Sequence, residues 1–135
     1  MKLLLASQSP RRKELLSQLG YQFETVSIDV DESYPAELRP ENIAEYVSNK
    51  KAKAFKLSSD EILLTSDTIV ALHQTILLKP KNKEEAFAML KNLSGKKHQV
   101  YTAFTIKTFD SEISRSSKTD VEFSEMNDDE ILFYI

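Results

Sequence analysis

The stretch LLLASQSPRRKELL (residues 3–16) decides the fold, because a strand, a tight turn and a helix start follow one another within it. The apolar run over residues 2–7 predicts a short buried strand. Ser9 has the side chain of a helix N-cap, and Pro10 suits the first helical position. Gly20 then predicts the helix end, since glycine accepts left-handed backbone. A strand that passes directly into a helix favours an α/β protein.

The rest of the chain continues this alternation of strands and helices. We expect further strands over residues 21–28, 61–66, 98–109 and 112–124, with strand or hairpin over residues 68–78. We expect helices to begin at Pro40, after Asn82 and after Asn127. The last two strands predict a long hairpin, which makes the sheet mixed. No repeat or linker divides the chain, so residues 1–135 are predicted to form a single domain.

Composition excludes several classes of protein. Hydrophobic residues make up 41% and charged residues 29% of the 135 residues, which is typical of a globular chain. The formal net charge of -3 argues against a broad nucleic-acid-binding face, although a small basic pocket for phosphates stays possible. The chain has no cysteine and no apolar run long enough for a signal peptide or membrane span. We therefore expect a cytoplasmic protein without a membrane partner.

The end of the chain is unusually apolar. Residues 131–135 are all apolar or aromatic, whereas a native terminus is usually polar and loosely held. This pattern predicts that the protein lacks a C-terminal portion, whose loss would expose apolar surface. The alternative is a C-terminal helix that docks on the core.

Two arginines follow the first strand at an unexpected place. Arg11 and Arg12 lie at a helix N-terminus, where cations are disfavoured by the helix dipole. A bound anion would remove this penalty, because phosphate oxygens accept from free N–H groups, hydroxyls and guanidinium groups together. The alternative is that both arginines lie on the surface and pair with Glu14 or another acid.

Carboxylates form the second candidate feature. Asp67 and Thr68 follow the apolar run over residues 61–66, and ligands of open α/β sheets gather beyond strand ends. A carboxylate there could hold a hard cation or orient water. One acid of the segment 29–32 could share a magnesium ion with Asp67. The alternatives are an ordinary strand-end turn and a solvated acidic loop.

Two lysines form the third candidate feature of a functional site. Lys51 shares a helix face with Val47, so it is expected to point inward, while the neighbouring lysines face solvent. Lys79 precedes Pro80 and is expected to be extended, so that either lysine could reach a triphosphate. The two histidines have no metal-site spacing, and the chain has no P-loop or nucleophile elbow.

The order of these motifs is more specific than any one of them. The succession LLLASQSPRRKELL, VDES, KKAKAF, SDTIV, LKP and LSGKKHQVYTAF closely resembles the Maf family of nucleoside triphosphate pyrophosphatases. The resemblance implies an elongated α/β fold, similar to inosine triphosphatase, in which helices flank a bent mixed sheet and a cleft separates two lobes. It also implies hydrolysis of a nucleoside triphosphate to a monophosphate and pyrophosphate, with magnesium or manganese.

The resemblance assigns roles to particular residues. Asp67 matches the proton acceptor, and Asp67 with Glu32 matches the metal-binding acids; whether Asp67 acts as base or mainly as metal ligand stays open. Lys51 and Lys79 match the family's basic positions in the cleft, so a catalytic role is expected for both. The substrate-binding positions match Ser7, Arg11, Arg12 and Thr68, of which Arg11 and Thr68 resemble the subgroup that acts on dTTP and UTP.

Two departures from the family pattern affect these expectations. Ser66 replaces the alanine usual before the catalytic aspartate, and the chain stops before a glycine-rich stretch that family members contain. The rival hypotheses are therefore a nucleotide-binding regulator of cell division, since the family is linked to septum formation, and an inactive truncated relic. A homodimer is also possible.

Overall fold

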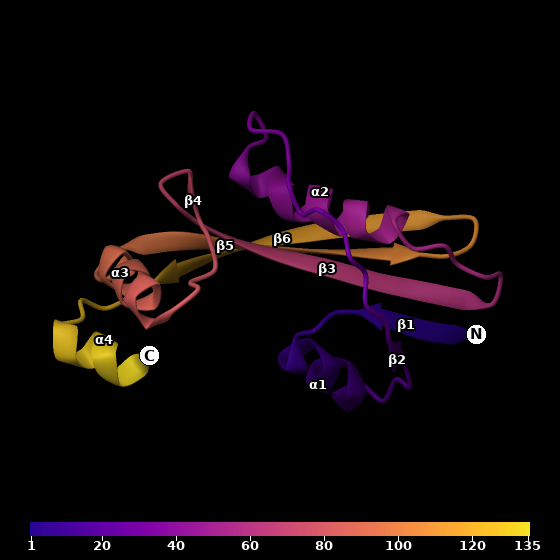
Figure 1. Cartoon of the computed structure of the whole chain (residues 1–135), viewed down its shortest axis with the longest axis horizontal. Helices are drawn as coiled ribbons and strands as arrows, with labels where there is room; N and C mark the ends of the chain where they lie inside the picture. Colours follow the sequence, from indigo (N-terminus) through magenta and orange to yellow (C-terminus); the bar gives the residue numbers. More distant parts are fainter.

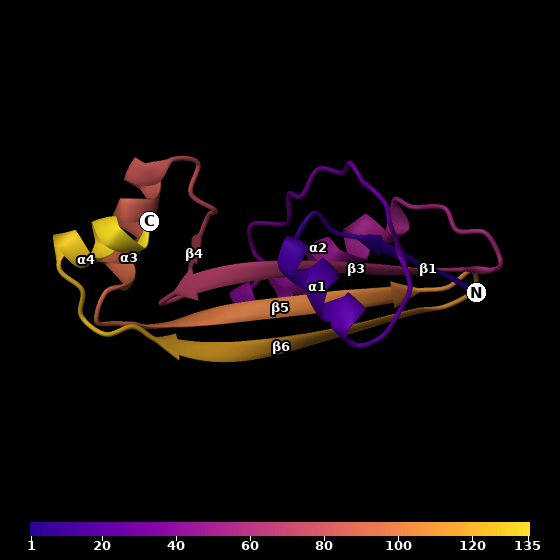
Figure 2. The same cartoon turned by 90° about the horizontal axis from the view of Figure 1, so that it is seen from below.

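Three long strands run the length of the molecule and give it an elongated shape (Figure 1). In the computed structural model, which describes residues 1–135, they are β3 (Glu61–Leu72), β5 (Lys97–Lys107) and β6 (Glu112–Glu122). Each pairs antiparallel with the next. At one end of these long strands lies the short strand β1 (Lys2–Ala6), and at the other end lie the helices α3 (Lys83–Leu93) and α4 (Asp128–Tyr134) (Figures 1 and 2).

Three short strands complete the mixed sheet. They are β1 (Lys2–Ala6), β2 (Glu24–Thr25) and β4 (Thr75–Leu77). The strand order is β2-β1-β3-β5-β6, in which β1 is parallel to both its neighbours, and β4 pairs antiparallel with β3. The predicted α/β fold with a mixed sheet is confirmed.

One edge of β3 is left open in its middle. The pairing with β1 ends where Ala6 meets Thr65, and the pairing with β4 on the other part of the strand begins only at Val70. Residues 66–69 therefore lie beside β5 on one edge and beside no strand on the other. Backbone groups of such a gap need other partners or a ligand.

Four helices begin at the predicted places, three after a capping side chain and one at Pro40. They are α1 (Pro10–Gln18), α2 (Pro40–Lys53), α3 (Lys83–Leu93) and α4 (Asp128–Tyr134). Ser9, Asn82 and Asn127 each accept a hydrogen bond from the first turn of their helix, as expected from their sequence positions. Asn127 and Glu130 complete a reciprocal capping box.

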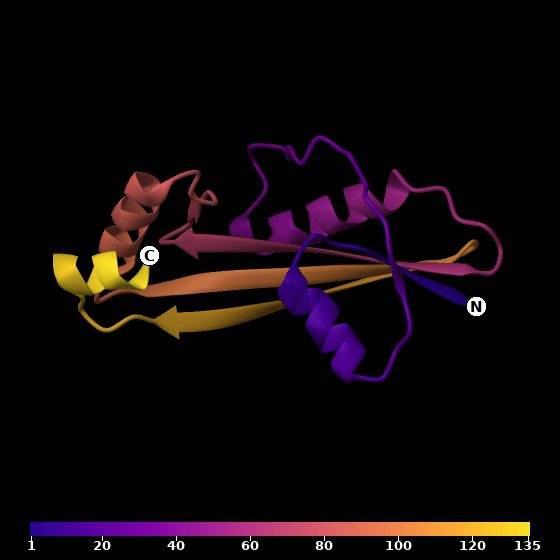
Figure 3. The same cartoon turned by 60° about the horizontal axis from the view of Figure 1, so that its bottom comes forward.

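Helix α2 packs along one face of the sheet, as seen from two directions (Figures 1 and 3). Its residue Ala52 belongs to one apolar cluster with Leu4, Leu57 and Leu63. Its residue Ala44 belongs to a second cluster with Ala71, Tyr101 and Ala103. The helix is thus held between two apolar contacts, and the polar groups between them face the middle of β3.

Two of the predicted strands differ substantially from the observed ones, while the others differ by one or two residues at their ends. The strand expected over residues 21–28 is only Glu24–Thr25, because the chain leaves β1 after two paired residues and continues as a loop. The strand expected over residues 61–66 continues to Leu72, so Asp67 lies within β3 and does not end it. The polar sequence TSDT resembles a strand end, yet its backbone pairs with β5 throughout.

The C-terminal residues divide into one buried side chain and several exposed ones. Ile131 is fully buried, whereas Leu132, Phe133 and Tyr134 are exposed. Helix α4 contacts α3, as the alternative of a docked C-terminal helix describes in part. None of the helices is both long enough and apolar enough to span a membrane.

Candidate active site

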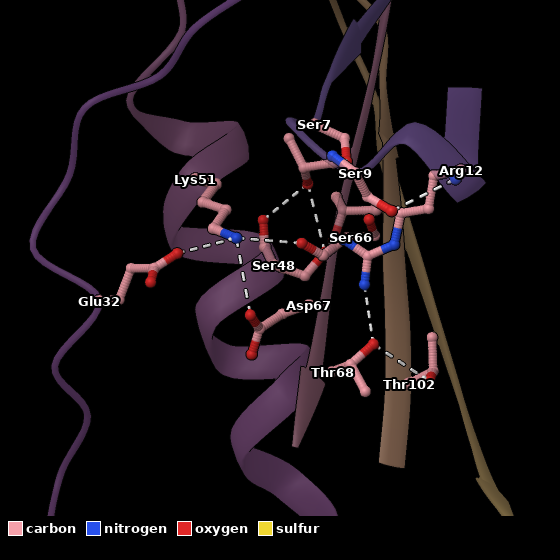
Figure 4. A network of polar contacts seen from close by, with 12 residues as sticks. Ser7, Ser9, Arg12, Glu32, Ser48, Lys51, Ser66, Asp67, Thr68 and Thr102 are labelled. Atoms are coloured by element: carbon pink, nitrogen blue, oxygen red, sulfur yellow. Dashed lines mark hydrogen bonds and ion pairs between the residues drawn. The ribbon is translucent and has the colours of Figure 1, made fainter. Parts of the chain in front are cut away.

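Lys51 is the centre of the polar contacts beside the open edge of β3 (Figure 4). Its ammonium group lies 2.9 Å from Glu32 Oε1 and 3.6 Å from Asp67 Oδ1. It also donates a 3.1 Å hydrogen bond to the carbonyl oxygen of Ser66, which no strand partner occupies on that edge. The side chain of Lys51 is only 17% exposed, so it points inward as predicted. A mostly buried ammonium between two carboxylates holds both acids near one point.

The next residue along β3 faces the other side of the sheet. Asp67 points to Lys51 of α2, and Thr68 accepts a 2.7 Å hydrogen bond from the guanidinium of Arg12, on α1 (Figure 4). Thr68 also lies 3.3 Å from the hydroxyl of Thr102 on β5. Successive side chains of a strand alternate between faces, so the site surrounds the open edge.

The turn before α1 forms one wall of the site. The backbone N–H of Ser9 donates to Ser7 Oγ at 3.1 Å, and the N–H of Arg12 donates to Ser9 Oγ at 3.3 Å. These bonds hold the turn at the helix N-terminus, where the helix dipole favours an anion. The side chain of Arg12 adds a full positive charge at the same place.

Two neighbouring cavities meet at this site. The first, of about 570 Å³, is mostly polar and is lined by Ser7, Ser9, Arg12, Ser27, Glu32, Lys51 and Lys79, among others. The second, of about 500 Å³, is mostly apolar and is lined by Tyr34, Asp67, Thr68, Ile69, Ile76, Leu78 and Met89, among others. Glu32 and Lys79 line both, so the two cavities are adjacent. Another cavity, between α3 and α4, contains none of the predicted site residues.

Burial dominates the electrostatics of Asp67. Loss of water around its carboxyl raises the pKa above the ordinary value, and the negative charge of Glu32 acts in the same direction. Lys51 opposes the shift through its charge and hydrogen bond, and Arg12 opposes it through its charge. A carboxyl with a raised pKa accepts a proton more readily than an exposed one.

The structure brings together most of the residues that the sequence singled out. Seven of them lie in the two cavities: Ser7, Arg12, Glu32, Lys51, Asp67, Thr68 and Lys79. Arg11 lines neither cavity; its guanidinium lies 3.7 Å from Glu14, and its side chain is 69% exposed. The alternative of a surface pair therefore describes Arg11, whereas Arg12 faces the polar cavity and its predicted role in binding an anion stays a prediction.

Other polar groups of the region have structural partners. Asp31, in the acidic segment, accepts from the N–H and the hydroxyl of Ser33, which leaves Glu32 as the acid facing Lys51. The hydroxyl of Ser66 is buried without a hydrogen-bond partner. No group of three or more His, Cys, Asp or Glu side chains is close enough to hold a metal by itself.

Sequence reasoning missed a set of hydroxyl residues in the core beside the site. Ser48 on α2 and Thr65 and Thr105 on β3 and β5 are fully buried and bonded to one another. Ser48 lies four residues after the buried Ala44, on the apolar face of its helix. A polar residue at an apolar position of the helical repeat was therefore the signal that could have found it.

Comparison with solved structures identifies the class of fold. The Ham1 protein of Staphylococcus aureus superposes on 90% of this chain and 71% of its own, with a TM-score of 0.57 and 14% identity. The molecule is thus an α/β protein with the fold of the Ham1-type structures.

The sequence identifies the family within this class. The family model described as Maf-like protein matches residues 2–135, and the chain belongs to this family. The dTTP/UTP pyrophosphatase of Bacteroides thetaiotaomicron is 45% identical over 98% of this chain and 70% of its own length. The dTTP/UTP pyrophosphatase of Phocaeicola vulgatus is 44% identical over 99% of this chain and 71% of its own length.

Proposed function

We propose that this protein is a nucleoside triphosphate pyrophosphatase that hydrolyses dTTP and UTP to the monophosphate and pyrophosphate. Family membership and relatives named for this activity support the proposal. The structural observation that carries it is the position of Lys51 between Glu32 and Asp67, beside Arg12 and the N-terminus of α1. Cationic side chains and a helix N-terminus suit a polyphosphate, and a carboxylate among them suits the activation of water.

The two cavities suggest the orientation of the substrate. The polar cavity, with Arg12, Lys51 and Lys79, suits the phosphate chain, and the apolar cavity, with Tyr34 and Met89, suits the nucleoside. The α-phosphate would then lie where the cavities meet, near Asp67. Each group of the substrate would contact side chains of matching polarity.

The reaction needs one water molecule. Its oxygen would attack the α-phosphorus, the bond from this phosphorus to the bridging oxygen would break, and pyrophosphate would leave with the electron pair. Asp67 would take the proton that the water loses, because burial keeps its pKa raised and thus suits it to this role. Arg12, Lys51 and Lys79 would neutralise charge on the phosphate oxygens.

A divalent cation fits this set of residues. Glu32 and Asp67 already converge on one positive group, the ammonium of Lys51. Two carboxylates that share a cation with substrate phosphates are a usual arrangement for Mg²⁺. Bound Mg²⁺ or Mn²⁺ would supply further neutralisation of phosphate charge. The cytoplasmic location, the homodimer and the role in septum formation stay predictions.

The test is a pyrophosphate-release assay with dTTP, UTP and the other common triphosphates, in the presence of Mg²⁺. We expect dTTP and UTP to be the preferred substrates, and Asp67→Asn to lower kcat/KM by about a hundredfold or more, as loss of a general base does. Glu14→Gln, a surface change, serves as the matched control. No turnover together with measurable nucleotide binding would favour a regulator instead. Undiminished turnover of Asp67→Asn would remove Asp67 from the mechanism.

A further inference from the structure

A row of hydroxyl side chains crosses three adjacent strands directly beneath α2. Thr65 on β3 is paired in register with Thr105 on β5, and Thr105 is paired with Ser114 on β6. We call these three residues the hydroxyl row. Ser48 and Asn49 of α2 contact it from above, in a region where helices and sheets are otherwise joined by apolar side chains.

The hydroxyl protons of this region can all be donated at once, in an arrangement that follows from the acceptors beside them. Thr65 Oγ1 donates to the carbonyl oxygen of Ser48 at 2.8 Å, and Thr105 Oγ1 donates to Asn49 Oδ1 at 3.1 Å. Ser114 Oγ also donates to Asn49 Oδ1. Each hydroxyl has a single proton, so in this arrangement Ser48 donates the 2.8 Å bond to Thr105, and the 2.9 Å contact between Thr105 and Ser114 carries no proton. Every hydroxyl proton then has an acceptor.

Such a buried polar network fixes position more narrowly than apolar packing does. Apolar contact is non-directional, whereas hydrogen bonds require defined distances and angles, and a fully satisfied buried network rigidifies its surroundings. Ser48, Thr65 and Thr105 are fully buried, so water does not compete for these bonds. A shift of α2 along the sheet would break several of them together.

The hydroxyl row lies immediately beside the candidate active site. Ser48 precedes Lys51 by one helical turn, so the two side chains lie on one face of α2 (Figure 4). Thr65 precedes Asp67 by two residues, so both point to the same face of β3. The network thus joins the turn of α2 that carries Lys51 to the segment of β3 that carries Asp67.

We propose that Ser48, Thr65 and Thr105 are positioning residues, which set the place of Lys51 relative to Asp67 through their hydroxyl groups. The catalytic consequence rests on the proposed function, but the geometric consequence does not. Without the network, α2 would keep its apolar contacts and the protein would fold. Lys51 would then lose its fixed distance to Asp67 and Glu32, and the phosphate site would be less well ordered.

A matched pair of variants at Thr105 separates the hydroxyl from the packing. Thr105→Val removes the hydroxyl and keeps the shape, while Thr105→Ser keeps the hydroxyl and removes a methyl group. Ser48→Ala is the second loss variant; it leaves Thr65 and Thr105 with their own acceptors and is therefore expected to fold. Ser94→Ala, which removes a hydroxyl bonded to the backbone of Met126, is the control for stability loss elsewhere.

Two readouts are needed. We expect kcat for dTTP to fall about tenfold or more in Thr105→Val and Ser48→Ala, with KM less affected, and Thr105→Ser and Ser94→Ala to stay near wild type. We also expect an amine-reactive reagent, followed by mass spectrometry, to label Lys51 faster in the two loss variants, relative to exposed Lys53 in the same molecule. Equal losses of kcat in Thr105→Val and Thr105→Ser would overturn the proposal. If wild type had no turnover, the labelling alone would decide: unchanged Lys51 labelling would overturn the proposal, and faster labelling would support it.

Discussion

Arg12 and Thr68 are 56 positions apart in the sequence, yet the guanidinium of Arg12 donates a 2.7 Å hydrogen bond to the hydroxyl of Thr68. This bond closes the open edge of β3 from the α1 side, while Lys51 closes it from the α2 side. The two cations therefore approach one segment of the strand from opposite faces of the sheet. An anion at this edge would have positive charge on both sides.

The two neighbouring arginines provide a direct test of the phosphate turn. Arg12→Ala is expected to weaken binding of a non-hydrolysable dTTP analogue by about tenfold or more, because a hydrogen bond to a charged group contributes about 1.5–3 kcal/mol. Arg11→Ala is expected to have a smaller effect, since Arg11 lines neither cavity. Titration calorimetry of both variants measures the difference. Equal losses would show that Arg11 turns into the site when nucleotide binds.

The apolar cavity can be tested independently of the phosphate site. Tyr34→Ala is expected to raise KM for dTTP about tenfold, because an aromatic contact with the nucleoside would be lost. Its affinity for inorganic pyrophosphate should stay at the wild-type value, whereas Arg12→Ala should lower that affinity. A parallel loss of both affinities in Tyr34→Ala would place the nucleoside elsewhere.

Local signals in the sequence predict the helices well, because each helix start depends on a few adjacent residues. Ser9, Asn82 and Asn127 cap the helices that they were expected to cap, and Gly20 and Gly95 adopt the positive φ angles that follow α1 and α3. The bounds of a strand depend also on pairing with strands that are distant in the sequence. The polar residues within β3 suggest a strand end, but Thr65 belongs to the hydroxyl row, and Asp67 and Thr68 face the site.

The residues of the site could be predicted from the sequence only in part, because their contacts also depend on parts of the chain that are far apart in sequence. Sequence patterns and the family resemblance singled out Asp67, Lys51 and Arg12 separately. Their mutual contacts depend on the packing of α2 and α1 on β3, which no local pattern encodes. The different orientations of Arg11 and Arg12 also arise from tertiary structure, since only Arg12 has Thr68 within reach.

Lys107 supports α2 at its C-terminal end, about one helical turn beyond the hydroxyl network. Its ammonium donates to the carbonyl oxygens of Ala52 and Phe55 at 2.9 and 2.8 Å, in the last turn of the helix and just beyond its end. Lys107→Met is expected to lower the free energy of unfolding by about 1–3 kcal/mol, because two charged hydrogen bonds are lost. Denaturant unfolding measures this change. Lys97→Met removes only a surface pair and should be near neutral; a similar loss there would indicate a general effect of charge.

The raised pKa of Asp67 suits the residue to accept a proton, but it is predicted to lower the stability of the folded protein at neutral pH. Because burial raises its pKa above the ordinary value of 3.8, the folded protein binds this proton more tightly than the unfolded chain does. Its contribution to stability is therefore fully present below pH 3.8 and is lost as the pH rises through the folded pKa. Asp67→Asn has no such titration.

The comparison of wild type with Asp67→Asn isolates this effect, because the other titrating groups are common to both proteins and largely cancel. We expect the free energy of unfolding of wild type, minus that of Asp67→Asn, to decrease as the pH is raised from acid to neutral, in denaturant titrations at a series of pH values. The decrease should begin near the ordinary carboxyl pKa and end above the raised one. If the difference instead increases with pH, the attraction of Lys51 and Arg12 outweighs the burial of the carboxyl. The pKa of Asp67 would then be lowered, and the residue would suit a permanently charged cation ligand better than a proton acceptor.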